Sequence, residues 1–318
     1  MKEVSVIIPC YNCRAFVEDT LKSLVQQTYR DFEVICVNDG STDETLSILE
    51  RWKEQSTLDM QIITQENGGV SRARNAGIRA AKGKYLLFLD ADDLYHPFYI
   101  QHLYSAMTQS SADVAYCWLS RNEKILSADR ETVPVICQNQ KEAMDNLLYR
   151  FANIGFYCYL YRKDVVLREN LEFDVNTRHF EDREFNWKYL CHCQSAVMVD
   201  APLYFYRVAE GSTTQSKTVK WRTDGIDAAI RIEEYVKNMG CDIYPELKSY
   251  LFPRVIWAMA KNYSLGGAKD AFCRLGREYD VKACMKRTAK DDNKLVALAS
   301  RLYLIHPILY YHIVRLKK

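Results

Sequence analysis

The sequence predicts an α/β fold: a Rossmann-like, mostly parallel sheet flanked by helices, with a C-terminal helical extension. Strand and helix patterns alternate through the first third of the chain, turn residues separate them, and the pattern beyond about residue 216 is helical throughout. Alternation of this kind is typical of βαβ units, whose strands join into a parallel sheet. With 318 residues, the chain is long enough for one large domain with an appendage. We therefore expect a first domain over residues 1–215 and a helical region over residues 216–318.

Strands and helices of the first domain follow one another with short connections. The expected strands are Val4–Ile8, Phe32–Val37, Gln61–Thr64, Tyr85–Leu89 and Val114–Leu119, and the expected helices are Ala15–Gln27, Asp43–Gln55, Val70–Ala81 and Tyr99–Gln109. The strands are apolar runs, as expected where helices cover both faces of a sheet. The turn over residues 39–43 ends in Asp43, which is suited to cap the next helix, and Pro97 suits a first helical turn.

The middle of the chain is less regular. A polar stretch over residues 122–136 is followed by helix Gln140–Phe151, the aromatic segment Phe156–Tyr161, helix His179–Leu190 and two short strands, Ala196–Val199 and Leu203–Arg207. The helix over residues 179–190 carries Glu181 and Asp182 in its first turn, where negative charge is favourable. This charge preference is one explanation of the acidic pair, and a catalytic role is the other.

The C-terminal region is predicted to consist of helices Ile226–Met239, Leu247–Tyr263, Lys269–Thr288 and Leu295–Leu316. The last helix spaces leucine and isoleucine by three or four residues, which marks one apolar stripe. Arg301, His306 and Pro307 interrupt this helix, so we do not expect it to span a membrane. Two alternatives remain: docking on an anionic membrane surface with the help of basic residues, or packing against neighbouring helices.

Charge and cysteine content limit the partners and the compartment. Residues 261–318 carry 13 Lys and Arg against 5 Asp and Glu, whereas residues 1–260 carry 30 against 36. The acidic body argues against nucleic-acid binding, and the basic tail is expected to face a different partner. No secretion signal is visible, and eleven scattered cysteines favour a reducing compartment. We expect a cytoplasmic protein, peripheral on the inner face of the cell membrane if the tail docks there.

Two cysteine pairs, Cys10 with Cys13 and Cys191 with Cys193, have spacings that call for a comparison of roles. A C-x-x-C beside a βαβ unit can be a redox pair, and four thiolates can bind one zinc ion. A second C-x-x-C is missing, however, and side chains two residues apart on a helix point in different directions. We expect these cysteines to be small buried hydrophobic side chains.

An acidic cluster follows the predicted strand over residues 85–89. Asp90, Asp92 and Asp93 lie where the strand ends, and sheets of this class bind ligands at the carboxyl ends of their strands. Clustered carboxylates repel one another unless a cation or hydrogen-bond donors compensate, and oxygen ligands suit Mg²⁺ or Mn²⁺. The alternative is an acidic turn that caps the following helix.

Four segments are expected at the carboxyl ends of successive strands: Pro9–Asn12, Asn38–Asp43, Asn67–Asn75 and Asp90–Asp93. Together with the acidic pair Glu181-Asp182, they resemble the inverting glycosyltransferases of family 2, which have the A-type nucleotide-diphosphosugar transferase fold. The resemblance covers roughly residues 3–215. Each segment alone is a weak signal, and their order and spacing make the set specific.

The resemblance implies a nucleotide-sugar site made of Pro9, Tyr11, Asp39, Asn67, Arg74, Asp90, Ala91 and Arg207. In this reading Asp39 accepts a hydrogen bond from the imide N–H of uracil, in a base pocket that Tyr11 also lines. Arg74 steadies the diphosphate through charged hydrogen bonds. Asp90 contacts the ribose or the sugar, and Asp92 binds the cation, Mn²⁺ or Mg²⁺, that bridges the two phosphates. Asp93 is expected to cap the next helix.

The resemblance also implies a catalytic and acceptor side. Asp182 matches the second acid of the family's pair and is the candidate general base, which takes the proton of an acceptor hydroxyl as it attacks the anomeric carbon. Glu181 would orient the acceptor, although the roles of the two acids could be exchanged. Trp187 is a candidate for stacking on acceptor sugars, together with Tyr157 and Tyr159, although aromatic residues at this spacing are more often core.

Two departures from the family pattern concern the acceptor. Ala209 stands where some relatives carry a histidine after the arginine at position 207, and Cys158 and Tyr159 stand where many relatives have Asn-Lys. These changes leave donor use intact and leave the acceptor open.

The sequence thus predicts a metal-dependent glycosyltransferase that moves a hexosyl or N-acetylhexosaminyl group from a UDP-sugar to a hydroxyl of a glycan or lipid-linked glycan. A bacterial surface polysaccharide is the expected product. The alternatives are a sugar nucleotidyltransferase, disfavoured because no Gly-rich phosphate loop follows the first strand, and a catalytically silent nucleotide-sugar-binding module. A dinucleotide oxidoreductase is disfavoured because no G-x-G-x-x-G follows a strand.

Overall fold

The computed structural model describes residues 2–150, 153–208 and 224–316. The chain separates into two compact units, an N-terminal unit over residues 1–176 and 181–208 and a C-terminal unit over residues 177–180 and 209–318. The predicted domain boundary between residues 215 and 216, like the expected end of a helix at Phe151, lies outside the described residues.

The N-terminal unit is an α/β structure built on one sheet, in which the described residues form nine strands. The strands are β1 (Val4–Cys10), β2 (Phe32–Asp39), β3 (Met60–Gln65), β4 (Tyr85–Phe88), β5 (Leu94–Tyr95), β6 (Val114–Ser120), β7 (Val135–Asn139), β8 (Tyr159–Arg162) and β9 (Ser195–Phe205). They are ordered β3-β2-β1-β4-β8-β6-β9-β5, and β7 pairs with β9. The predicted fold class is confirmed.

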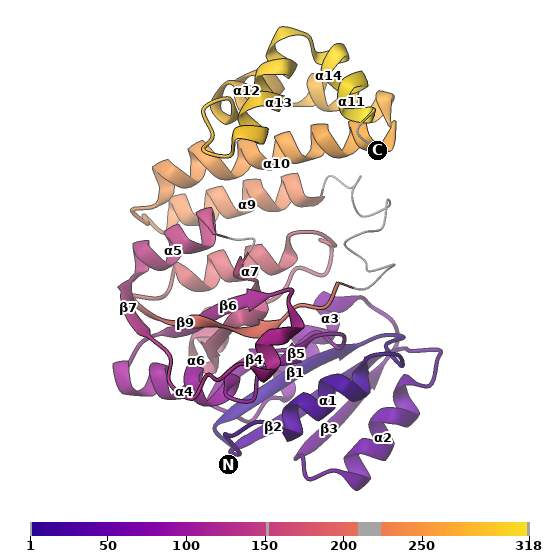
Figure 1. The fold of residues 1–318 in the computed structure, drawn as a ribbon, viewed down its shortest axis with the longest axis vertical. Coiled ribbons are helices and arrows are strands. Elements are labelled where there is room, and N and C mark those ends of the chain that lie inside the picture. Colours follow the sequence, from indigo (N-terminus) through magenta and orange to yellow (C-terminus); the bar gives the residue numbers. More distant parts are fainter. Residues whose placement is uncertain (1, 151–152, 209–223, 317–318) are drawn as a thin grey trace. The chain divides into compact units, whose positions relative to one another are not determined.

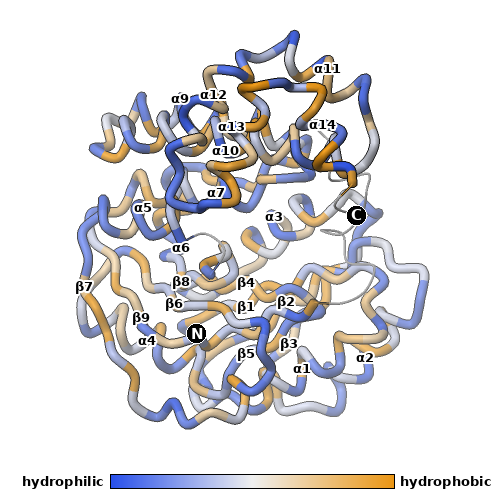
Figure 2. Tube along the Cα trace, turned by 45° about the horizontal axis from the view of Figure 1, so that its top comes forward, coloured by the Kyte–Doolittle hydropathy of each residue, from blue (hydrophilic) through white to orange (hydrophobic). Residues whose placement is uncertain are grey.

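Helices cover both faces of this sheet. They are α1 (Val17–Val25), α2 (Thr45–Gln55), α3 (Val70–Ala80), α4 (Tyr99–Ser110), α5 (Gln140–Tyr149), α6 (Lys163–Arg168) and α7 (Glu181–Leu190). In Figure 1, α1 and α2 lie on one face of the strands β1 to β3 and α3 lies on the other. Figure 2 draws β1 and β2 mostly in the hydrophobic colour, and every residue of β2 is buried. These apolar runs form central strands because both of their faces are covered.

The first half of the sheet is parallel, and this positions the predicted site. β1 pairs in parallel with β2 and with β4, and β2 pairs in parallel with β3. Cys10 lies opposite Asn38, and Asp39 lies opposite Gln65, so neighbouring strands end at the same edge. The chain order reverses between β1 and β4, which is where sheets of this class open a ligand crevice.

The second half of the sheet is mixed, because β8 runs antiparallel to both β4 and β6. The two short strands predicted near residues 196–207 are in fact one strand, β9, whose register against β6 shifts on both sides of Trp118. Its partner at the shift is Pro202, which has no N–H to donate and favours a bulge. The Trp118 indole also donates to Asp200 at 2.6 Å. Four short elements, β5, β7, β8 and α6, are absent from the sequence-based prediction.

The C-terminal unit is helical, as predicted. Its helices are α9 (Asp224–Asn238), α10 (Tyr244–Gly266), α11 (Lys269–Glu278), α12 (Val281–Thr288), α13 (Lys294–Ile305) and α14 (Pro307–Arg315). No helix of the described ranges is long and apolar enough to cross a lipid bilayer.

Two helices predicted as continuous are each divided. The helix predicted over residues 269–288 breaks at Asp280, whose carboxylate accepts from the Ala283 N–H and begins α12. The helix predicted over residues 295–316 breaks at His306, where Nδ1 accepts from the Leu309 N–H at 3.1 Å. Pro307 then occupies the first turn of α14, where its missing N–H costs nothing.

Candidate active site

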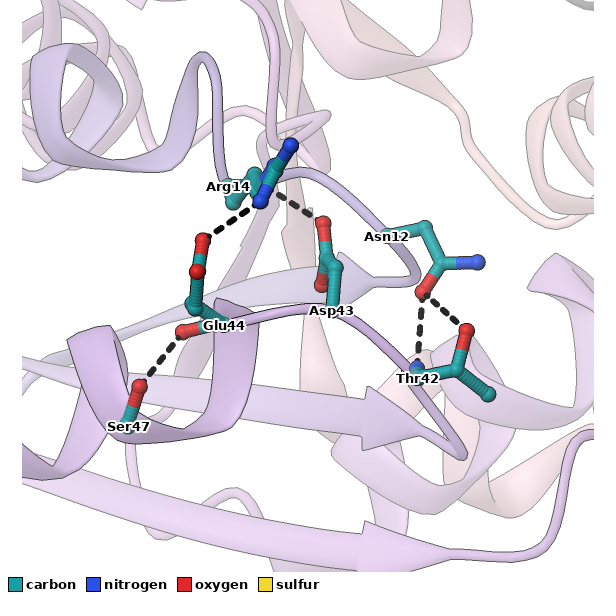
Figure 3. A pocket seen from close by; sticks show the side chains of 6 residues that line it. All are labelled: Asn12, Arg14, Thr42, Asp43, Glu44 and Ser47. Carbon is teal, nitrogen blue, oxygen red and sulfur yellow. Dashed lines mark hydrogen bonds and ion pairs between the residues drawn. The ribbon is translucent and has the colours of Figure 1, made fainter.

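The loops that follow β1 and β2 are fastened together at the carboxyl edge of the sheet. Asn12 has a positive φ of 48°, and its Oδ1 accepts from the Thr42 N–H at 2.8 Å. The Arg14 N–H donates to Asp43 at 3.2 Å, and the Arg14 guanidinium donates to Glu44 at 2.7 Å (Figure 3). The open pocket between these loops is lined by Asn12, Arg14, Thr42, Asp43, Glu44 and Ser47. Asp43 therefore joins two loops and is not the N-cap of α2, which is Glu44.

Asp39 lies at the end of β2 and is buried. Its Oδ1 accepts from the Gln65 side chain at 2.7 Å and from the Gly68 N–H at 2.9 Å, and its Oδ2 accepts from the Gly69 N–H at 2.8 Å. Gly69 has a positive φ of 88°, which explains the glycine. The carboxylate therefore holds the third loop in place, and Oδ2 keeps lone-pair capacity for one more donor.

The other predicted base-pocket residues lie around Asp39. The Asn67 side chain donates to the Asp39 carbonyl at 3.0 Å, so Asn67 fixes the loop as well as lining it. Pro9 is a half-buried residue of β1, next to its carboxyl end. Tyr11 follows that strand, and its side chain is 53% exposed, which leaves it available to a ligand.

Arg74 joins the two acidic parts of the predicted site. It lies on α3, is buried, and donates from Nη2 to Asp90 at 3.0 Å and from Nη1 to Glu181 at 3.2 Å. Its guanidinium carbon is 4.1 Å from the centroid of the Phe156 ring. Burial lowers the pKa of Arg74, but the carboxylates of Asp90 and Glu181 outweigh it and raise this pKa above its ordinary value. The structure thus places Arg74 as a bridge between carboxylates, a role that its sequence motif does not reveal.

Glu181 and Asp182 lie in the first turn of α7, as predicted, although the helix begins at Glu181 and not at His179. Burial, and then the charge of Asp182, raise the pKa of Glu181 to about 7, and Arg74 opposes the shift. Asp182 accepts a hydrogen bond from the Arg183 N–H at 2.7 Å. Phe180, directly before the pair, has a φ of 79°, a conformation that bulky residues adopt rarely and mostly where function requires it.

In the acidic cluster after β4, Asp93 is buried, and Asp90 and Asp92 are half-buried. Asp93 accepts from the Tyr204 hydroxyl at 2.7 Å and from the Arg207 N–H at 2.7 Å. It therefore does not cap α4, whose N-cap is Phe98; it fastens the end of β9 to the acidic loop. The carbonyl of Ala91 accepts from the Thr20 hydroxyl at 2.9 Å, which fixes the loop from the other side.

Arg207 lies beside this loop, as its predicted role requires. Its Nε donates to the carbonyl of Asp92 at 2.8 Å, and its Nη2 is 3.6 Å from a carboxylate oxygen of Asp19. Ala209 lies outside the described residues. Asp19, which pairs with Arg207, and Tyr204, which donates to Asp93, are contacts that the sequence-based prediction does not include.

Asp92 is the predicted metal ligand. Burial, and then the charge of Asp90, raise the pKa of Asp92 to about 6. Within the described residues no other side chain donates a hydrogen bond to its carboxylate, and no group of three or more His, Cys, Asp or Glu side chains gathers as a metal site. A carboxylate that is repelled by a neighbouring carboxylate suits a hard divalent cation. The remaining ligands of the cation would have to come from the sugar nucleotide or from water.

The aromatic residues predicted to stack on acceptor sugars are largely core. Trp187 is only 2% exposed and Tyr159 is fully buried, so neither has a ring face open to a ligand, and the acceptor role predicted for Trp187 is wrong. Tyr157 is half-buried and stacks on Tyr204, with ring centroids 4.4 Å apart. Aromatic side chains at strand and helix spacing more often pack in the core, and the Trp187 and Tyr159 side chains do so here.

All eleven cysteines lie in the described residues, and none of them is assigned to a disulfide bond there. Cys10, Cys13, Cys191 and Cys193 are buried, which agrees with the role of small hydrophobic side chains. Hydrogen bonds with Cys13 and Cys36 raise the pKa of Cys10 well above its ordinary value, so the thiol form is favoured there.

A sheet whose parallel strands reverse order beside a loop of carboxylates belongs to the α/β proteins that bind their ligand at such a switch point. The comparison with known proteins is more specific. The model of glycosyl transferase family 2 matches residues 5–187, and the chain belongs to this family, as predicted.

The chain is similar to the uncharacterized glycosyltransferase EpsJ of Bacillus subtilis, at 35% identity over 67% of this chain and 63% of that protein. It spans less than two thirds of that relative's length. Among solved structures, TarS residues 1–349 of Staphylococcus aureus in complex with UDP superimposes with a TM-score of 0.63 at 18% identity, over 99% of this chain and 90% of the other. The mannosyltransferase PcManGT of Pyrobaculum calidifontis, solved with GDP-Man and Mn²⁺, gives 0.56 at 16% identity, over 96% and 87%. At these identities the two structural matches concern the fold.

The raised pKa of Glu181 predicts a pH-dependent stability. Its pKa in the folded protein, about 7, lies above the ordinary value of 4.5, so the folded state binds this proton more tightly. Stability from this group is fully present below about pH 4.5 and is lost as the pH rises through about 7. Glu181→Gln, which does not titrate, should gain on the order of 1–3 kcal/mol relative to the wild type between the ends of that window. Melting temperatures across the window test this, with Glu172→Gln, an exposed carboxylate, as the matched control; parallel curves for all three proteins would contradict it.

Proposed function

We propose that this protein is a metal-dependent inverting glycosyltransferase that moves a sugar from a UDP-sugar to a hydroxyl group of a glycan. The observation that carries the proposal is the bridge of Arg74, 3.0 Å from Asp90 on the acidic loop and 3.2 Å from Glu181 on α7. One buried guanidinium thus holds together the side that resembles a donor site and the side that resembles an acceptor site. Family membership supports the reaction class.

The donor is proposed to lie along the carboxyl edge of β1 to β4. Tyr11 is exposed beside the end of β1, and Asp39 keeps one lone pair on Oδ2 for the imide N–H of uracil. Asp90 would contact the ribose or sugar, and Arg207 the diphosphate end. Arg74 is not proposed to bind the diphosphate directly, because each of its Nη atoms already donates a hydrogen bond to a carboxylate. The solved neighbour TarS binds UDP, which supports a uridine nucleotide.

Asp92 is proposed to hold Mn²⁺ or Mg²⁺ with phosphate oxygens of the donor. The cation would supply Lewis-acid stabilisation of the departing diphosphate. Asp92 suits this role because its carboxylate already lies in the field of Asp90, which a positive charge would relieve. The Mn²⁺ in the PcManGT structure supports a divalent ion without identifying it for this chain.

Asp182 is the proposed general base. The acceptor hydroxyl would pass its proton to the carboxylate while its oxygen attacks the anomeric carbon from the face opposite the diphosphate, so the configuration inverts. Glu181 is proposed to orient the acceptor, because Arg74 already occupies one of its oxygens. The acceptor class is proposed to be a glycan or lipid-linked glycan of a bacterial surface polysaccharide, made in the cytoplasm, where the eleven free cysteines would stay reduced.

A donor panel tests the proposal. The full chain is incubated with UDP-glucose, UDP-galactose, UDP-N-acetylglucosamine and GDP-mannose, and nucleotide release is measured in Mn²⁺, in Mg²⁺ and in EDTA. We expect release from at least one UDP-sugar with a divalent ion and none in EDTA. Release only from GDP-mannose would overturn the uridine assignment, and equal release in EDTA would overturn the metal.

A further inference from the structure

The last two helices of the C-terminal unit present an apolar stripe to the surface. On α13 the exposed fractions are 73% for Leu295, 65% for Leu298 and 78% for Ile305. The stripe continues on and just beyond α14 with Leu309, 46% exposed, and Leu316, 84% exposed. Spacings of three and seven residues place these side chains on one face of each helix. Exposure this high for large aliphatic side chains, repeated in register, is unusual for a surface that contacts only water.

The stripe is not the face that these helices use for packing. On α13 the buried residues are Val296, Ala297, Ser300 and Tyr303, which lie on the opposite side of the helix. On α14 the buried residues are Tyr310 and Tyr311. The core of the unit is therefore built without the stripe: one face of these helices is buried, and the other stays exposed.

The charged residues within residues 294–316 have one sign. Residues 294–316 contain Lys294, Arg301 and Arg315 and no Asp or Glu. Lys294 and Arg301 are both exposed and are seven residues apart, so they follow one flank of the stripe on α13. Arg315 takes the corresponding flank on α14, three residues after the exposed His312. An apolar band with a basic edge is the pattern of a helix that lies in the interface of an anionic bilayer.

We infer that the stripe over α13 and α14 docks on the surface of a membrane that contains anionic phospholipid. Leucine and isoleucine side chains enter the boundary between head groups and acyl chains, and Lys294, Arg301 and Arg315 contact lipid phosphates. The helices lie on the membrane and do not cross it: α13 has 12 residues, and Pro307 ends its continuity. The inference does not depend on the glycosyltransferase proposal.

A second copy of the chain fits this surface less well than a bilayer does. A symmetric dimer through the stripe would bring the same basic residues together from both subunits, with no carboxylate on residues 294–316 to neutralise them. Anionic lipid head groups supply that negative charge.

The test is co-sedimentation of the full chain with vesicles of phosphatidylcholine, with and without phosphatidylglycerol. We expect binding to the anionic vesicles that weakens as salt is raised. Leu298→Glu combined with Ile305→Glu should reduce this binding about tenfold or more, because it places charge in the apolar interface. Lys294→Gln combined with Arg301→Gln should weaken binding and flatten its salt dependence.

Controls keep the outcomes distinct. Leu167→Glu introduces one such charge at a 51% exposed leucine on α6, in the N-terminal unit, and should bind vesicles like the wild type. Circular dichroism shows that each variant is folded. The vesicles contain no glycan, so the result is independent of any acceptor. If wild-type protein fails to bind anionic vesicles, or if light scattering shows a dimer that only the stripe variants break, the inference is overturned.

Discussion

Asp182→Asn is expected to retain donor binding and to slow sugar transfer by about 10²–10⁴-fold, the usual contribution of a general base. Asparagine has nearly the same shape and keeps the acceptor oxygen that receives the Arg183 N–H at 2.7 Å. What it loses is the ability to take a proton. The bridge between Arg74 and Glu181 does not involve Asp182 directly, so the site should keep its arrangement.

Separate measurements of UDP affinity and of single-turnover transfer test this expectation. Glu172→Gln is the control, since its carboxylate is exposed and pairs only with Arg79 at 3.5 Å. Glu181→Gln distinguishes the two acids: we expect it to raise KM for the acceptor more than it lowers kcat. A large loss of kcat in Glu181→Gln together with normal turnover in Asp182→Asn would show that Glu181 is the general base and that the two assignments must be exchanged.

The succession of strands along the first third of the chain, and the edge that carries the site, could be predicted from local sequence. β1, β2 and β4 are apolar runs that end abruptly in polar residues, and a parallel sheet brings such ends together whatever the loops do. Strand β7 was missed because it is an edge strand with little burial, and its residues lack the apolar run of a central strand. Hydrophobic sequence patterns reflect burial, so they indicate buried central strands more clearly than exposed edge strands.

Side-chain partners within the site could not be predicted in the same way. Arg74 reaches Asp90, 16 positions away, and Glu181, 107 positions away, and nothing in the local sequence of α3 specifies either contact. Asp93 was expected to cap the next helix because aspartate favours helix starts, but a tertiary contact with Tyr204 competes for the carboxylate. Trp187 shows the reverse error, in which a plausible ligand contact loses to core packing.

Asp92→Ala is expected to remove the metal dependence of nucleotide binding. In the wild type, UDP should raise the melting temperature more in Mn²⁺ than in EDTA, because a ligand that binds only the folded state stabilises it by about 2.7 kcal/mol at a hundred times its Kd. For a chain of 318 residues that corresponds to roughly 3–5 °C. Without the Asp92 carboxylate the cation loses its protein ligand, and the two conditions should give equal shifts.

The same variant should be somewhat more stable than the wild type when no ligand is present. The pKa of Asp92 in the folded protein, about 6, lies above its ordinary value of 3.8, so its ionised form is disfavoured by folding, and stability is lost as the pH rises through about 6. Above that pH the wild type holds a carboxylate next to Asp90 with no cation, and removing it relieves the repulsion. Asp59→Ala, at an exposed position between β2 and β3, is the control and should change neither property. A carboxylate that destabilises the protein in the absence of a cation is expected at a cation site. If Asp92 instead capped a helix, Asp92→Ala would lower the melting temperature in EDTA and leave the effect of Mn²⁺ unchanged.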